Sequence, residues 1–575
     1  MASIKDKYYN SFSGGIVRNK SPNDLKDNEL QRGRNFEVDE QGRIRKRRGS
    51  YAFGQSLSNI VQFHHDGIAL YAAVISDTTT IVYKLFTVMN TAAIATTDTT
   101  IAVSSAPGFA ASGTFEIEGD IVTYTGGGAA GPLTGVSGIS TAHAANRTMN
   151  QWQSIGALTG HTSEEGVWFG FLNGVTVIHT ASAGGGSDIS TYDGTTITAA
   201  SGEPTPARLL EIFRDRAFVI GGTGGENRVY YSNLGDATSW PATVNDNSFE
   251  VEDSSGEFIT SIKQYRKNLI VSKPSTMYAY SGSLPVRQLS TSWGVFNENC
   301  IQEINGLLYG FGPRGIFATN GVSFLDIGQP IKEFLNVVVQ RIINTSGGLV
   351  SNVYPTVSTA QFDDKFIVFV DDLTEPETGI SLNNVSFAYS VRTKKWEMWD
   401  GLGSNYMVKS LNAFRAANQE LKQSRPVLFF SDGTNSYRAF ESRFVEKTSN
   451  AVGVLRGTDV WGDYFKDTTT VASDTVFEVI TKPFDLGLPQ YEKQFGYLKV
   501  FSEKPQGVHV SVIIDGGDPI PLGQCNKTIE RFKFPPGTQG YRCALVFEES
   551  SQSVGLVING CVFEECKTVD QNING

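Results

Sequence analysis

Residues 304–321 read INGLLYGFGPRGIFATNG and predict two β-hairpins almost back to back. The first hairpin turns at Asn305-Gly306, a pair typical of two-residue hairpin turns. The second turns at Arg314-Gly315. The runs on either side are apolar and contain Ile, Phe and Tyr, which favour strands. This stretch therefore predicts a meander of short antiparallel strands.

Looser copies of the same pattern recur along the chain. With the stretch at 304–321 included, the first strands of the later copies lie near residues 217, 269, 307, 366 and 427, which gives spacings of 52, 38, 59 and 61 residues. Propeller blades of four strands repeat at about 40–50 residues, and insertions lengthen some of them. We therefore predict an all-β protein with an irregular β-propeller over residues 51–86 and 151–445. A set of unrelated meanders is the alternative.

Two further β units and a connection complete the predicted organisation. Alternating segments at 93–103 and 113–125, joined by Gly-, Ala- and Ser-rich turns, predict a small inserted β domain over residues 87–150. Residues 446–472 are polar and charge-mixed, which predicts a connection. Six strand-like segments follow it and predict a C-terminal β-sandwich over residues 473–570.

One segment has the periodicity of a helix. Between Pro330 and Ile343, apolar residues recur at spacings of three and four, and Pro330 suits the first turn. A helix with one apolar side must bury that side against another part of the chain or another subunit. We expect it to pack on the sheets of its own chain, with a neighbouring subunit as the alternative.

Charge is distributed unevenly in this acidic chain. The net charge is −11, but residues 1–50 hold 12 Lys and Arg against 7 Asp and Glu, which gives +5 and leaves −16 for the rest. An acidic body argues against ordinary nucleic-acid binding, because that binding depends on neutralising phosphates. An acidic channel wall would instead let a polyanion slide past without sticking.

The densest basic feature is the run from Arg43 to Arg48, in which five of six residues are basic. Such a run could bind phosphates. Because the remainder of the chain is acidic, we favour a contact between this run and an acidic surface of its own or a neighbouring subunit.

The five cysteines form no CxxC pair, and their odd number fits a chain made in a reducing cytoplasm. We expect them to be small core residues, with a C-terminal disulfide or metal site as the alternative. No signal peptide and no membrane-spanning run are predicted, so we expect neither secretion nor membrane insertion.

The sequence predicts no enzyme. Asp193-Gly194 only approaches the repeated boxes of sialidase propellers, and an ordinary turn explains it. The adjacent acids at 363–364 and 371–372 would point to opposite faces of a strand, so they cannot act together on one bond. The six histidines lack metal-binding spacings, and the glycines at 221–225 lack the lysine and helix of a phosphate loop. We therefore predict no catalytic residue, cofactor or metal.

The first fifty residues carry a resemblance to a known family. The Gly14-Gly15-Ile16 turn, the Pro22-Asn23 step, the Asn35-Phe36 pair and the closing Gly42 to Gly49 stretch stand in one order. This opening resembles that of the nozzle proteins of short-tailed bacteriophages, also called tail tubular protein B. The inserted domain also resembles a small β module of phage tail and capsid accessory proteins.

The resemblance implies a structural virion protein rather than an enzyme. Family members form a ring of six copies below the adaptor ring of the portal, and the ring is the distal tail channel through which the genome leaves. It implies contacts with the adaptor and with tail fibres or spikes, and viral DNA passing through the lumen without specific binding. The protein would be made in the host bacterial cytoplasm and function in the virion tail.

The resemblance also indicates which residues would form subunit contacts. We expect residues 1–50 to be an extended assembly arm whose deletion leaves the propeller folded and abolishes the ring. The interface residues expected in it are Gly14, Gly15, Ile16, Arg43, Arg45, Lys46, Arg47 and Arg48. A receptor-binding or carbohydrate-binding tail component is the first alternative, and a glycan-degrading propeller enzyme is the second.

Overall fold

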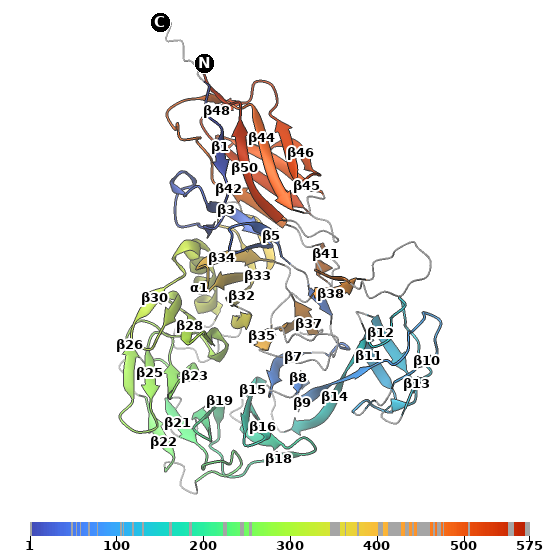
Figure 1. Ribbon diagram of the computed structural model, residues 1–575. Helices are drawn as coiled ribbons and strands as arrows, with labels where there is room; N and C mark the ends of the chain where they lie inside the picture. Colours follow the sequence, from blue (N-terminus) through green and yellow to red (C-terminus); the bar gives the residue numbers. More distant parts are fainter. Residues whose placement is uncertain are drawn as a thin grey trace.

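Figure 1 shows the computed structural model of the chain. The structure describes residues 3–47, 50–52, 54–57, 59–66, 69–76, 79–103, 106, 108–117, 120–128, 131–159, 164–182, 187–221, 227–241, 246–251, 256–345, 357–362, 364–376, 379–400, 406–411, 427–431, 436–439, 442–445, 460–463, 466–467, 473–474, 477–503, 507–549 and 557–569.

Nearly all regular elements are strands, which confirms the predicted all-β class. In the described residues, seven successive sheets share a four-strand plan that is typical of a propeller. From the innermost strand outward, the first three sheets are β7 (Ile60–His65), β8 (Leu70–Ser76), β9 (Thr79–Met89) and β14 (Thr148–Thr159); β15 (Glu164–Leu172), β16 (Val175–Ser182), β17 (Ser187–Tyr192) and β18 (Ile197–Ala199); and β19 (Ala207–Phe213), β20 (Arg216–Gly221), β21 (Arg228–Tyr231) and β22 (Ser248–Glu250).

The remaining four sheets follow the same order. They are β23 (Ser261–Tyr265), β24 (Asn268–Ser272), β25 (Met277–Tyr280) and β26 (Arg287–Ser290); β27 (Ile301–Ile304), β28 (Leu307–Gly312), β29 (Gly315–Thr319) and β30 (Phe324–Asp326); β31 (Ser358–Phe362), β32 (Lys365–Thr374), β33 (Ser381–Ser390) and β34 (Lys395–Trp399); and β35 (Tyr406–Leu411), β36 (Val427–Ser431), β37 (Ser436–Ala439) and β6 (Ser50–Ala52).

The innermost strands connect the sheets to one another. β7, β15, β19, β23, β27, β31 and β35 contact each other in that order, and β35 also contacts β7. The seventh sheet takes its outermost strand from the start of the chain, since Ser50–Ala52 of β6 pair with β37. This pairing ties the two ends of the propeller segment together.

The two hairpins predicted at residues 304–321 are confirmed. Ile304 pairs with Leu307 across a turn in which Asn305 has φ 51° and Gly306 has φ 77°. Gly312 pairs with Gly315 across the next turn. Positive φ at both central positions gives the hairpin the twist of its strands, which is why Asn-Gly suits it.

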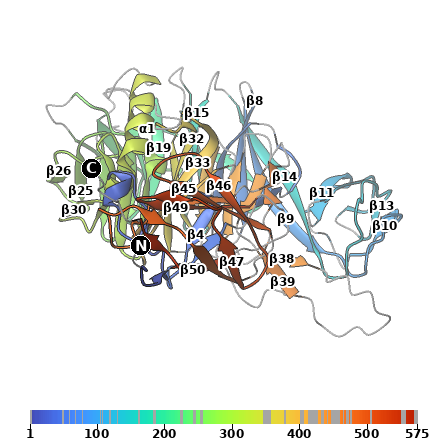
Figure 2. The same ribbon diagram turned by 90° about the horizontal axis from the view of Figure 1, so that it is seen from above.

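The inserted segment extends the first propeller sheet. β11 (Gly113–Ile117) pairs with β14 and with β12 (Asp120–Tyr124), so one sheet continues from the propeller into the insertion. The insertion has its own apolar core, which includes Phe115, Leu133 and Met149. Figures 1 and 2 both show it projecting from one side of the propeller.

The C-terminal unit is a β-sandwich of two sheets (Figure 1, orange and red). One sheet contains β4 (Phe36–Val38), β5 (Ile44–Lys46), β50 (Val557–Glu564), β44 (Tyr497–Glu503) and β47 (Ile529–Lys533), with β1 (Lys7–Tyr9) also on β50. The other contains β2 (Gly15–Ile16), β3 (Glu29–Arg34), β42 (Phe477–Thr481), β49 (Cys543–Glu549), β45 (Val508–Ile514) and β46 (Ile520–Cys525).

The N-terminal segment is therefore not the separate arm that the sequence predicts. Its strands β1 to β5 belong to the two sandwich sheets, and Tyr9 pairs with Cys561 far along the chain. Phe12, Leu30 and Ile44 are buried in the shared core. The correction has a simple cause, since the short apolar groups of the segment fill positions that the C-terminal strands leave open.

The predicted helix is α1 (Lys332–Thr345), preceded by a 3-10 turn at Gln329–Ile331. Phe334, Leu335 and Val338 are buried on its inner face, and α1 contacts β29. The Phe334 ring lies 5.5 Å from that of Phe387 on β33. The helix thus packs on the sheets of its own chain, as expected.

The five cysteines are buried free thiols, in agreement with the expected core role. Cys561, for example, lies on β50 in the sandwich core. Burial raises the pKa of its thiol to about 12, so the thiol stays protonated at neutral pH.

Candidate functional site

The N-terminal strands of the sandwich contact the sixth propeller sheet, and this junction is the candidate functional site. Strands β2, β3 and β4 all contact β34, the outermost strand of that sheet. The Trp399 indole nitrogen donates to Phe36 O at 3.0 Å, and Asn35 N donates to Met398 O at 2.9 Å. The segment that carries the predicted site residues therefore joins the two units.

Gly14 and Gly15 lie in close contact with backbone of other segments, and Ile16 follows them. Gly15 has φ +64°, which favours glycine, and a Cβ there would lie 2.9 Å from Trp396 O. A Cβ at Gly14 would lie 2.4 Å from Asn28 O. Ile16 is buried in the core. The Gly-Gly-Ile turn is thus used for close contact within the chain.

Arg43 and Arg45 pair with carboxylates of the same chain. Asp39 Oδ2 lies 2.7 Å from Arg43 Nε and 3.0 Å from Arg45 Nη2. Arg43 Nη1 also lies 2.8 Å from Glu503 Oε1 on β44. Burial raises the pKa of Asp39, but hydrogen bonds from Arg43 and the charges of both arginines outweigh burial, so the net pKa lies below its ordinary value.

Lys46 is buried although it belongs to the basic run. On β5, Ile44 and Lys46 share the inward face, whereas Arg45 points outward. Lys46 Nζ forms an ion pair with Glu549 of β49, and the two side chains are 0% and 1% exposed. This pair links the two sheets of the sandwich.

Arg47 is also buried, at the end of the same run. Its Nε donates to Asn35 Oδ1 at 3.0 Å, and its Nη2 donates to Asp400 O at 3.0 Å, directly after β34. Arg48 lies outside the described residues. The basic run therefore has acidic or polar partners in its own chain, and its contact with another subunit stays a prediction.

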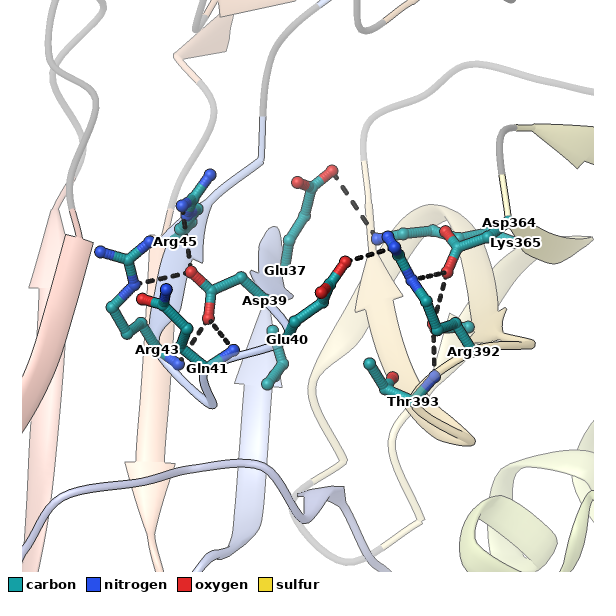
Figure 3. Close-up of a pocket in the computed structure, with 12 residues that line it drawn as sticks. Glu37, Asp39, Glu40, Gln41, Arg43, Arg45, Asp364, Lys365, Arg392 and Thr393 are labelled. Atoms are coloured by element: carbon teal, nitrogen blue, oxygen red, sulfur yellow. Dashed lines mark hydrogen bonds and ion pairs between the residues drawn. The ribbon is translucent and has the colours of Figure 1, made fainter.

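A cleft of about 370 Å³ separates the β4–β5 hairpin from the sixth propeller sheet (Figure 3). In Figure 3, Asp39, Arg43 and Arg45 gather on the hairpin side, and Asp364 and Arg392 on the propeller side. The charged residues that line it are Glu37, Asp39, Glu40, Arg43, Arg45, Asp364, Lys365 and Arg392. Cations and carboxylates are equal in number, so the cleft does not favour a ligand of one charge sign.

Arg392 and Lys365 connect the propeller wall to the hairpin. Arg392 pairs with Glu40 across the cleft, and its Nε lies 3.5 Å from Asp364 Oδ2 on its own side. Lys365 Nζ lies 2.5 Å from Glu397 Oε2 and 3.9 Å from Glu37 Oε1. Two propeller cations therefore reach carboxylates of the N-terminal segment.

Glu397 forms a hydrogen bond with the edge of β4 that has no neighbouring strand. Its Oε1 accepts from Val38 N at 2.9 Å, a backbone group that has no neighbouring strand on that side. Burial raises the pKa of Glu397 to about 7 against the attraction of Lys365. Burial lowers the pKa of Lys365, but Glu37 and Glu397 outweigh burial, so its net pKa lies above the ordinary value.

A second group of ion pairs joins the segment to the helix side of the propeller. The buried Glu375, after β32, lies 3.1 Å from Arg32 Nη2 and 3.8 Å from Arg18 Nη2. Arg32 and Arg34 also lie 3.4 and 3.5 Å from Glu478 of β42. One segment thus bridges propeller and sandwich through charges that the sequence analysis did not single out.

The contacts of the junction hold the two units together. In the described part of the chain, no three His, Cys, Asp or Glu side chains are arranged to hold a metal. Asp364 of the predicted acid pair accepts from Ser390 Oγ at 3.0 Å, whereas Asp363 lies outside the described residues. Among those residues, no helix is long and apolar enough to cross a membrane.

Comparisons with known proteins identify no family. No family model and no curated protein matches the chain. Solved structures that resemble it include the β-propeller domain of the Trilobed protease from Pyrococcus furiosus, at 11% identity and TM-score 0.27, covering 61% of this chain and 97% of that one. A mitotic checkpoint complex chain matches at 9% identity and TM-score 0.32, covering 61% and 90%. A glycoside hydrolase matches at 10% identity and TM-score 0.22, covering 96% and 100%.

Proposed function

We propose that this protein is a structural subunit of the tail of a short-tailed bacteriophage. In this proposal, six copies form a nozzle ring, which is the distal channel for genome ejection. The ring contacts the adaptor above it and carries tail fibres or spikes. The protein has no enzymatic role, and DNA passes through the ring without specific binding.

The proposal is supported above all by the position of the residues that carry the resemblance. Gly15, Ile16, Lys46 and Arg47 are in contact with the propeller or buried in the sandwich, at the junction of the two units. A channel wall under the pressure of a packaged genome needs domains that do not move apart. Buried ion pairs and close backbone contacts at the junction suit that need.

Charge supports the same proposal. Residues 51–575 have a net charge of −16, and the basic residues 43, 45 and 46 of the N-terminal segment are neutralised by carboxylates of the same chain. An acidic wall repels phosphates, so DNA would not be held back. The expected location is the virion tail, after synthesis in the host cytoplasm.

Stoichiometry tests the proposal directly. Native mass spectrometry and negative-stain microscopy of the purified protein should give rings of six copies. Three copies per particle would support a fibre or spike component instead, and a protein that forms no ring at any concentration would refute the proposal. Cleavage of a host polysaccharide, lost on a single Asp or Glu substitution, would support the enzyme alternative.

A further inference from the structure

Three neighbouring propeller sheets present exposed aliphatic side chains on one face. Leu234 follows β21, Leu284 precedes β26, and Val322 lies between β29 and β30; they are 67%, 64% and 79% exposed. Strands alternate in direction within each sheet, so the turn between its first two strands and the turn between its last two lie at the same end. Figures 1 and 2 both show β25, β26 and β30 side by side.

The turns on this face are tied to one another. Asn173 Nδ2 of the second sheet donates to Gly235 O, beside Leu234, at 2.8 Å. Tyr265 Oη of the fourth sheet donates to Gly306 O of the fifth at 2.8 Å. These two hydrogen bonds tie the backbone of one sheet's turn to the neighbouring sheet.

The third and fourth sheets are tied in the same way. Arg214 packs so closely on the turn before Leu284 that a Cβ at Gly282 would lie 2.0 Å from Arg214 Nη1. Because these contacts use backbone oxygens and glycines, the aliphatic side chains remain available. Because the backbone of these turns is already held in place, binding there would cost little backbone entropy.

The fourth sheet is also basic. Residues 258–297 contain five Lys and Arg and no Asp or Glu, which leaves a net charge of −16 for the other residues of the chain. Arg266, Lys267 and Arg287 are exposed, and none forms an ion pair with a described carboxylate. This differs from the N-terminal basic run, in which Arg43, Arg45 and Lys46 form ion pairs with carboxylates of the same chain.

We propose that these side chains form a docking surface for an acidic protein surface, and that its occupant is a second copy of this chain. The rim surface consists of Leu234, Arg266, Lys267, Leu284, Arg287, Val322 and Leu325. The choice of a second copy rests on the proposed ring and on charge, since the rest of the chain carries the complementary −16. Exposed aliphatic side chains favour a protein partner over a nucleic acid, because they form no hydrogen bond or ion pair with phosphates.

The test measures self-association of the full chain by sedimentation velocity. The variant Val322→Asp/Leu325→Asp should raise the dissociation constant by about 100-fold or more, because each central interface side chain contributes about tenfold or more. The matched control, Ile380→Asp/Ile529→Asp, changes exposed aliphatic residues elsewhere and should leave the dissociation constant within about threefold of wild type. Unchanged melting temperatures would show that both variants are folded.

A second variant tests the charge. Lys267→Glu/Arg287→Glu should weaken self-association, and the weakening should diminish at high salt, because screening reduces surface electrostatics. The inference is overturned if wild type stays monomeric, if Val322→Asp/Leu325→Asp associates as wild type does, or if the control weakens as much. The inference is also overturned if duplex DNA binds the wild-type protein and the charge variant alone fails to bind DNA. The number of copies in the ring is measured separately. If Val322→Asp/Leu325→Asp still forms a ring of six copies as wild type does, the rim surface is refuted as the contact between copies, and the proposed function remains in place.

Discussion

Replacing Lys46 by methionine should destabilise the sandwich unit, because Glu549 would lose its ion pair with Lys46 in a site that is 1% exposed. Removing one partner of a buried ion pair costs about 3–5 kcal/mol. In a unit of this size each kcal/mol shifts Tm by about 2–4 °C, so the expected loss is at least about 6 °C. Differential scanning calorimetry of the full chain measures it, with urea unfolding as the second readout.

Two controls separate charge burial from loss of packing. The double variant Lys46→Met/Glu549→Leu should recover most of the stability, since apolar residues of similar volume often replace a buried pair at no cost. Arg45→Met breaks a pair whose arginine is 44% exposed and should change the free energy of unfolding by less than about 1 kcal/mol. The reasoning fails if Lys46→Met melts as wild type does, or if the double variant is no more stable than the single one.

Three further predictions concern the junction and the helix. Gly15→Ala should cost about 1–3 kcal/mol in thermal unfolding, because φ +64° is strained for alanine and the new Cβ would lie 2.9 Å from Trp396 O; an unchanged Tm would contradict this. The pKa of Glu397 is about 7 in the folded protein and about 4.3 in the unfolded chain. Protonated Glu397 therefore adds to the free energy of unfolding, and this contribution should be complete below pH 4 and lost as the pH rises to 7. Urea midpoints at pH 5 and 8 should lie closer together in Glu397→Gln than in wild type. Leu335→Ala should cost about 2–5 kcal/mol by calorimetry, whereas the exposed Val337→Ala should cost less than about 0.5 kcal/mol.

The features that could be predicted from the sequence depend on neighbouring residues. The hairpin at Asn305-Gly306 was predictable because φ values of 51° and 77° are what Asn and Gly adopt easily. The helix over Lys332–Thr345 was predictable because its apolar residues recur at helical spacing. Both signals lie within a window of fewer than twenty residues.

The junction could not be predicted because its partners are far apart in the chain. Glu503 is 460 residues from Arg43, and Glu549 is 503 residues from Lys46. Nothing near Lys46 indicates that Glu549 will pair with it, and near Arg43 only the contact with Asp39, four residues away, could be expected. One local signal was available, since Lys46 stands two residues after the apolar Ile44 and so shares its face of a strand.

The position of the N-terminal segment changes how an assembly role can be tested. Deleting residues 1–50 would remove strands β1 to β5 from both sandwich sheets and part of β6 from the propeller, so loss of a ring would also follow from loss of the fold. Within the segment, an interface can be probed only through side chains that the fold does not need, such as the half-exposed Arg45. The rim surface avoids this difficulty, because Val322 and Leu325 extend into solvent from turns and an edge strand that other contacts hold in place. Substitutions there separate assembly from folding, which deletion of the N-terminal segment cannot do.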